Sequence, residues 1–259
     1  MKLIFHPEFY RVYTSDPAAE AGRMEAIMGE LQDFDVITPE PATENDILLV
    51  HTNTHLEWVK NLGDVFDVAM LAAGGAVLAA DISFTEPSFA AIRPPGHHAS
   101  PDSSWGFCYF NNIAIAVKKL LSERRIRRAV IVDFDLHFGD GTANTFRNDR
   151  DVSYFHMSGG EINGIAEFLG KGEYDVIAVS AGFDRAKEDW GGILEMSDYR
   201  DIGRIIRENA EKTAMERGLP CLRVGIITGC LERMSEPFLR DSDSFAYIIS
   251  SALHEPCSF

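Results

Sequence analysis

The stretch that decides the fold is AVIVDFDLHFGDGT, residues 129–142. Its first six residues are apolar and mostly β-branched except for Asp133, which indicates a buried strand. Polar side chains follow at once in Asp135, His137 and Asp140. A buried strand that ends in acidic and imidazole side chains is typical of the carboxyl edge of a parallel α/β sheet, where ligands bind.

Two further apolar segments end in the same way. The candidate strand Ser88–Ile92 is followed by RPPGHHAS, residues 93–100. The candidate strand Tyr174–Ser180 runs into VSAGFD, residues 179–184. Because the carboxyl ends of parallel strands meet at one edge of a sheet, we expect the three polar clusters to converge in one crevice.

Helical segments separate these strands. A short strand is expected at Lys2–Phe5, and apolar periodicity predicts helices over Ala18–Leu31, Val65–Ala80, Asn111–Leu121 and Asp198–Arg217. Strands that alternate with helices predict an α/β fold with a mostly parallel β-sheet flanked by helices. The sequence shows no linker, internal repeat or low-complexity segment, so we expect a single domain over residues 1–259.

Composition narrows the class of protein. Of 259 residues, 46% are hydrophobic and 25% are charged, which is an ordinary globular mixture. Lys and Arg total 24 against 40 Asp and Glu, so the formal net charge is −16. This charge argues against direct nucleic-acid binding through a basic face, whereas it suits a cationic substrate. No apolar run approaches the roughly 20 residues that span a bilayer, and we expect a cytoplasmic protein with no membrane partner.

The residues after the central strand suit a metal site. Asp135 and His137 are two apart, so on an extended segment they point the same way, and Asp184 is the candidate third ligand. Two carboxylates and one imidazole suit Zn²⁺, and Fe²⁺ as well. A bound metal ion lowers the pKa of its water to about 7 and so supplies a nucleophile at neutral pH.

The candidate acid–base groups are His97 and His98, and Asp133 and Asp140 are candidates to orient them. Taken singly, an Asp-x-His string or a His-His pair is more often structural than catalytic. Three such clusters at strand ends together favour a catalytic site.

At these residues the chain resembles the histone deacetylase family, within the arginase/deacetylase superfamily. The matching strings are RPPGHHAS at 93–100, WGFCYFNNIAIA at 105–116, VDFDLHFGDGT at 132–142 and VSAGFD at 179–184, with LAAGGAVLAA at 71–80 similar to a family helix. The likeness runs from about His6 to about Gly218 and implies the three-layer arginase/deacetylase-like fold.

The resemblance also implies roles for individual residues. A zinc ion would be held by Asp135, His137 and Asp184. The tandem general base and acid would be His97 and His98, with Asp133 as the partner of His97 and Asp140 as the partner of His98. The narrow tunnel for an acetylated amine side chain would be lined by Gly106 and Phe107. The implied reaction is hydrolysis of an N-acetyl amide in acetyl-lysine proteins, acetylpolyamines or other small acylated amines.

Two departures from the family pattern concern the pocket wall and a second metal. The stretch between His156 and Tyr174 lacks the Pro-Gly-Thr-Gly turn of many members, which predicts a more open or differently walled pocket, and His156 falls where many members have Ser. A two-metal ureohydrolase of the arginase type is the less favoured alternative. It needs a second carboxylate two residues after the metal histidine, where this chain has Gly139.

The sharpest departure is the C-terminal tail. The family has a Glu-Gly-Gly-Tyr turn whose Tyr hydrogen-bonds the substrate carbonyl, and that string does not occur here. After Pro220 the chain reads CLRVGIITGCLERMSEPFLRD. With synonymous codons (TGC TTG AGG GTG GGT ATT ATC ACC and onward), the frame that starts one base earlier reads LEGGYYHRVLGKNVRAFLEGF. We therefore predict that residues 221–259 are an atypical, frameshifted tail and that the family Tyr would have fallen at about Ile226.

The missing Tyr leaves a second alternative function open, a catalytically impaired homologue that binds metal. Leu222–Ile227 is still apolar enough to form a strand. A lesser candidate metal pair is His51 and His55, which are four residues apart and would share a helix face.

Overall fold

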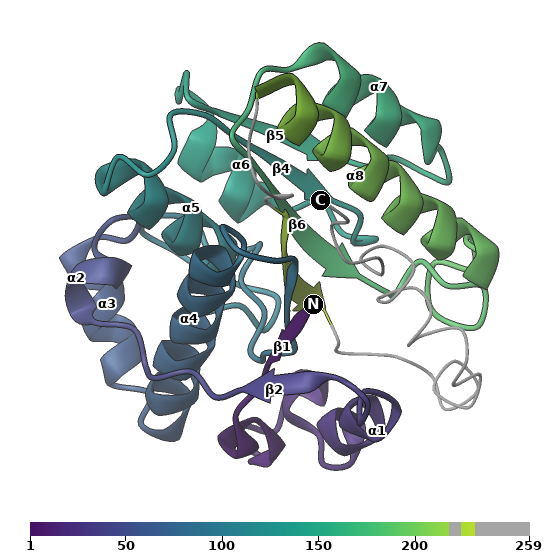
Figure 1. Ribbon diagram of the computed structural model, residues 1–259. Coiled ribbons are helices and arrows are strands. Elements are labelled where there is room, and N and C mark those ends of the chain that lie inside the picture. Colours follow the sequence, from purple (N-terminus) through teal and green to yellow (C-terminus); the bar gives the residue numbers. More distant parts are fainter. Residues whose placement is uncertain (218–223, 231–259) are drawn as a thin grey trace.

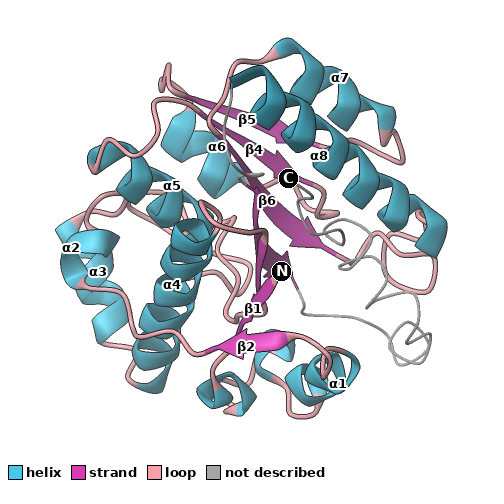
Figure 2. Ribbon diagram, in the orientation of Figure 1, coloured by secondary structure: helices cyan, strands magenta, loops and turns pink. Residues whose placement is uncertain are grey.

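The computed structural model describes residues 1–217 and 224–230, and the described strands form one parallel sheet covered by helices on both faces (Figure 1, Figure 2). The strands are β1 Lys2–Ile4, β2 Asp35–Ile37, β3 Ser88–Ala90, β4 Ala129–Asp133, β5 Val152–His156, β6 Val176–Gly182 and β7 Val224–Cys230. Their order across the sheet is β2-β1-β3-β7-β6-β4-β5, and every pairing is parallel. The expected α/β class and parallel sheet are confirmed.

Helices form the two outer layers. They are α1 Arg23–Glu30, α2 Glu44–Ile47, α3 Asn53–Lys60, α4 Asp64–Ile82, α5 Asn112–Ser122, α6 Asp140–Phe146, α7 Asn163–Lys171 and α8 Met196–Arg217. In Figure 1, α4 and α5 lie on one side of the sheet, and α7 and α8 lie on the other. The expected helix over Ala18–Leu31 begins only at Arg23, because Pro17 starts a separate 3₁₀ turn and Gly22 has a positive φ of 88°.

The apolar composition of helix α4 is explained by its burial in the protein. By length and composition it could cross a membrane, but 67% of its apolar window is buried inside the protein. Its glycine pair lies where other segments approach closely. A Cβ on Gly74 would overlap the Glu40 carbonyl oxygen, and one on Gly75 would lie 2.8 Å from the Ile92 side chain. Gly74 and Gly75 therefore allow these segments to pack closely against α4.

Strand β7 comes from the segment where departure from the family was expected. It lies between β3 and β6, with Ile226 aligned with Phe89 on one side and with Val179 on the other. The apolar segment expected over Leu222–Ile227 thus does contribute a strand, shifted to Val224–Cys230. The rest of the predicted tail, residues 221–223 and 231–259, lies outside the described residues.

The histidine pair near α3 is structural. His51 is 3% exposed, and its ring stacks on that of His55 with centroids 4.8 Å apart. The Asn111 backbone N–H donates to His51 Nε2 at 2.9 Å, so Nδ1 carries the proton and donates to the Ser100 carbonyl oxygen at 3.0 Å. Both ring nitrogens of His51 are thereby engaged by the backbone, which is inconsistent with the metal pair considered from the sequence.

Burial, with a smaller contribution from His55, lowers the pKa of His51 from 6.5 to about 3. Between these values the unfolded chain binds one proton more than the folded chain. The stability that this group contributes is therefore complete above pH 6.5 and declines on acidification, by up to about 1.4 kcal/mol per pH unit.

We predict that His51→Gln, which can still accept from the Asn111 N–H, flattens this decline. Urea unfolding of the metal-free protein and the variant between about pH 7 and pH 5 measures it. The variant should start less stable and lose less on acidification. Parallel curves for the two proteins would contradict the assignment of His51 as a buried neutral group.

Candidate metal centre

Three side chains predicted as metal ligands converge at the carboxyl edge of the sheet. One ligand atom from each of Asp135, His137 and Asp184 lies within 4.8 Å of the other two. His137 Nδ1 is 2.9 Å from Asp184 Oδ2 and 3.3 Å from Asp135 Oδ1. Asp135 is fully buried and Asp184 is 5% exposed, whereas the His137 side chain is 40% exposed. The cluster therefore has a buried floor and one side open to solvent.

The strand ends hold these side chains in place. Asp135 and His137 lie in the loop after β4, which ends at Asp133, and Asp184 lies in the loop after its neighbour β6, which ends at Gly182. The Leu136 N–H donates to Asp184 Oδ1 at 2.9 Å, and the His137 N–H donates to Asp135 Oδ1 at 2.7 Å. Each carboxylate is thus oriented by a backbone amide of the loop after β4.

The electrostatics of the cluster suit a bound cation. Burial and the nearby Asp135 charge raise the pKa of Asp184 to about 6. The hydrogen bond with Asp135 and the charge of Asp184 raise the pKa of His137 above its ordinary value, against the opposing effect of burial. Two buried carboxylates that resist joint ionisation, beside an imidazole, form a donor set that a divalent ion would complete. The residues present therefore fit a metal ion.

Room for the Asp135 carboxylate depends on Gly182. A Cβ at this last residue of β6 would overlap Asp135 Oδ2 and lie 2.6 Å from the Asp135 Cβ. Asp135 sits against the backbone of the neighbouring strand, which a larger residue at 182 would prevent. The requirement for glycine at position 182 thus comes from the contact with Asp135 itself.

Next to the cluster lies the first of the two tandem histidines. His97 is 1% exposed, its Nδ1 is 3.2 Å from Asp133 Oδ2, and its Nε2 is 3.9 Å from Asp135 Oδ1. The same Asp133 oxygen accepts a hydrogen bond from the Tyr154 hydroxyl at 2.9 Å. A carboxylate only accepts, so His97 donates from Nδ1, and Nε2, which faces the cluster, is its basic nitrogen.

The second histidine has a carboxylate partner of its own. His98 Nδ1 lies 2.6 Å from Asp140 Oδ1, and the Trp105 indole N–H donates to Asp140 Oδ2 at 2.9 Å. Burial, with a further contribution from His97, lowers the pKa of His98 to about 4. Burial raises the pKa of Asp140, but hydrogen bonds from Trp105 and His98 outweigh it and keep that pKa below its ordinary value. At neutral pH, His98 is a neutral imidazole beside an ionised carboxylate.

Of the two predicted tunnel residues, Gly106 lies against His98. A Cβ on Gly106 would be 2.7 Å from His98 Cδ2, and both Gly106 and Phe107 have positive φ, 58° and 64°. A positive φ in a bulky residue such as Phe107 marks a backbone held by its surroundings. Trp105 and Trp190, each more than half exposed, flank this region, with ring contacts to His98 and His137 respectively.

Sequence reasoning missed three residues of this region: Tyr154, Trp105 as a hydrogen-bond donor, and Arg185. Tyr154 and Trp105 hold the carboxylates of Asp133 and Asp140 from segments distant in sequence, so no local pattern reveals them. The sequence did hold a clue to Arg185. It comes next to the candidate ligand Asp184 and soon after a buried strand, where a charged side chain is uncommon.

The position that a second metal would need is crowded. A Cβ on Gly139 would lie 2.5 Å from both Asp133 Oδ2 and the Tyr154 hydroxyl. A carboxylate at 139 could not be accommodated without moving these two groups. The surroundings of Gly139 therefore weigh against the two-metal alternative.

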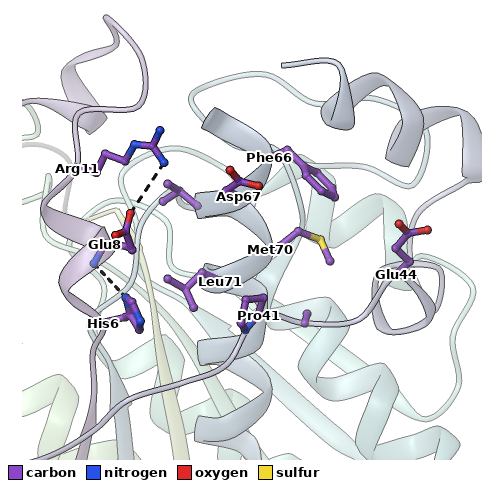
Figure 3. Close-up of a pocket in the computed structure, with 11 residues that line it drawn as sticks. His6, Glu8, Arg11, Pro41, Glu44, Phe66, Asp67, Met70 and Leu71 are labelled. Carbon is purple, nitrogen blue, oxygen red and sulfur yellow. Dashed lines mark hydrogen bonds and ion pairs between the residues drawn. The ribbon is translucent and has the colours of Figure 1, made fainter. Parts of the chain in front are cut away.

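A separate cavity of about 560 Å³ lies at the amino end of α4 (Figure 3). Its floor includes Met70, Leu71 and Phe66, and charged side chains such as Glu8 and Arg11 stand at its edge. It shares no lining residue with the metal cluster or the tandem histidines. The cavity is therefore distinct from the candidate metal centre.

Comparison with known proteins agrees with this architecture. The solved structure titled "Crystal Structure of HDA15 HD domain" superposes with a TM-score of 0.81 at 20% identity and covers 97% of this chain and 88% of that one. The fold is thus the three-layer α/β fold of the arginase/deacetylase class, as predicted.

Sequence comparisons find similar proteins of one family. The model described as "Histone deacetylase domain" matches residues 62–162. A "Probable deacetylase" from Methanothermobacter thermautotrophicus is 36% identical over 176 residues, covering 60% of this chain and 53% of that protein. One from Archaeoglobus fulgidus is 40% identical over 168 residues, with 58% and 45% covered. The chain is thus similar to members of the histone deacetylase family, and it spans about half the length of these curated relatives.

We predict that Gly182→Ala weakens Zn²⁺ binding by about 10- to 100-fold, because the new methyl group displaces the Asp135 carboxylate. Calorimetric titration of the metal-free protein with Zn²⁺ measures the change. The matched control is Gly170→Ala on α7, where an added Cβ has no neighbour within 4 Å. Equal Zn²⁺ affinity in both variants would show that Asp135 is not a ligand.

Proposed function

We propose that the protein is a metal-dependent amidohydrolase that removes acetyl groups from acetylated amines, with Zn²⁺ as its metal. The observation that carries this proposal is the convergence of Asp135, His137 and Asp184 within 4.8 Å, beside two histidines that each face a carboxylate. A relative from Pseudomonas aeruginosa, 33% identical over 130 residues, is named "Histone deacetylase-like amidohydrolase" and supports the reaction class. That match covers 43% of this chain and 34% of the relative.

The residues of this chain would have separate roles in metal binding and in proton transfer. A divalent ion bound by the cluster would polarise the substrate carbonyl and acidify a water molecule. His97 and His98, whose Nδ1 atoms donate to Asp133 and Asp140, present Nε2 as the basic nitrogen. One imidazole accepts the proton of the attacking water. The protonated imidazole then delivers a proton to the amine as the C–N bond breaks.

The shape of the site and the net charge of the chain support a proposal for the substrate class. The buried cluster with one open side suits the acetyl end of a long side chain or small amine, and the net charge of −16 attracts cationic partners. We propose acetyl-lysine in proteins or acetylated polyamines as substrates, with no direct nucleic-acid or membrane partner, in the cytoplasm.

We predict that His98→Ala lowers the turnover of a fluorogenic acetyl-lysine substrate by about 10²- to 10⁴-fold, since it removes an acid–base group. Turnover is measured after EDTA treatment and again after Zn²⁺ is restored. The control is His6→Ala, a histidine that lines the separate cavity and not the metal centre. If the two variants were equally active, His98 would have no part in the chemistry.

The missing oxyanion Tyr supports the impaired-enzyme form of this proposal. Ile226, near where the Tyr would fall, is aligned with Val179 inside the sheet, three positions before Gly182 at the carboxyl edge. Strand β7, Val224–Cys230, contains no Tyr. We propose that residues 221–259 are a frameshifted tail and that this chain works more slowly than its frame-corrected counterpart.

We predict that the gene holds a one-base shift near the codon of Cys221 and that a protein with the frame corrected turns over substrate about 10²- to 10³-fold faster. Nucleotide sequencing checks the first statement, and parallel assays of the two proteins check the second. Equal rates would show that the tail is not what limits activity. If both proteins, loaded with Zn²⁺, were inert toward acetylated amines, the proposed function itself would be wrong.

A further inference from the structure

Arg185 follows the candidate ligand Asp184 and is buried beneath the metal cluster. It is 2% exposed and is the largest of the fully buried side chains in the described part of the protein. A buried guanidinium is costly unless its N–H groups and its charge find partners. The partners of Arg185 therefore indicate what its placement achieves.

The guanidinium binds two loops at once. In the loop after β4, Nε donates to the carbonyl oxygens of Phe134 and Asp135, each at 3.0 Å, and Nη2 donates to Asp135 O at 2.8 Å. In the loop after β5, Nη1 donates to the Gly159 carbonyl at 2.7 Å and Nη2 donates to that of Met157. The carbonyls of a ligand-bearing loop and of its neighbour thus enclose one cation.

The second loop also brings His156 into contact with this cation. Arg185 Nη2 is 3.2 Å from His156 Nε2, and since a guanidinium can only donate, that nitrogen accepts. Burial and the charge of Arg185 lower the pKa of His156, against the opposing effect of Asp133. His156 is therefore a neutral acceptor, and this contact ties its ring to Arg185.

The charge of Arg185 also has partners. The carboxylates of Asp184, Asp135 and Asp133 all act electrostatically on it. The guanidinium therefore places a positive charge among these carboxylates. A neutral residue of the same volume would supply neither the charge nor the donors.

We propose that Arg185 is a positioning residue whose guanidinium serves as a built-in cation, locking the Asp135 loop to the Met157–Gly159 loop and so holding the metal cluster ready to bind. This inference rests on the proposed metal site and deepens it. Arg185 acts through Asp135 and the backbone and does not itself contact substrate.

We predict that Arg185→Ala weakens Zn²⁺ binding to the metal-free protein by about 10- to 100-fold, as loss of a group that orients metal ligands does. Millimolar guanidinium ion should recover much of the affinity of Arg185→Ala, because it fits the vacated carbonyls, whereas equal NaCl should not. Hydrogen exchange should quicken in residues 134–138 and 156–159. Arg185→Lys, which keeps the charge with fewer donors, should lie between wild type and Ala.

The matched control is Arg93→Ala. Arg93 is 3% exposed and also donates to backbone carbonyls, those of Arg11, Ala18 and Glu20, in the N-terminal segment. Both alanine variants should lower the urea midpoint, but only the change at 185 should alter Zn²⁺ affinity and respond to guanidinium.

If Arg185→Ala bound Zn²⁺ as tightly as wild type, this inference would be wrong while the metal site stood. If the wild-type protein did not bind Zn²⁺, the proposed function itself would be wrong. If Arg185→Ala does not fold, Arg185→Lys serves as the test. The positioning role would be wrong if Arg185→Lys bound Zn²⁺ as tightly as wild type and its hydrogen exchange were unchanged.

Discussion

The repulsion between two buried carboxylates, Asp135 and Asp184, is the constraint on which this molecule depends. Burial alone would push either group toward its neutral form, and the pKa of Asp184, raised to about 6, records that tension. The fold offsets it with backbone N–H donors from the loop after β4 and with His137. What remains unbalanced is a deficit of positive charge at the open side of the cluster, which a divalent ion would fill.

Around that cluster, polar side chains come in fixed pairs. Each tandem histidine donates to one carboxylate, and each of those carboxylates accepts from one more donor, Tyr154 at Asp133 and Trp105 at Asp140. Such pairs hold the tautomer and the ring orientation of an imidazole before any substrate arrives. The hydrogen bonds that satisfy these buried polar groups thus also fix the tautomer of each imidazole.

The C-terminal segment shows how tolerant a parallel sheet is of its sequence. Strand β7 occupies a central position between β3 and β6, although its residues depart from the family pattern. An apolar run of sufficient length can satisfy a central strand position because the main requirements are backbone pairing and burial on both faces. A catalytic turn has no such tolerance, since it needs one particular side chain at one place. A strand can therefore form where the sequence of a turn has changed.

The sequence by itself determined the class of fold and the residues of the cluster. Apolar strands that end in Asp135, His137 and Asp184 are readable locally, because strand period and sheet-edge chemistry are properties of short segments. The order of the strands, the pairing of Tyr154 with Asp133, and the enclosure of Arg185 by two loops were decided only by the tertiary structure. These features join segments far apart in the chain, and hydrogen bonding between such segments depends on distances that only the packed sheet and its helices establish.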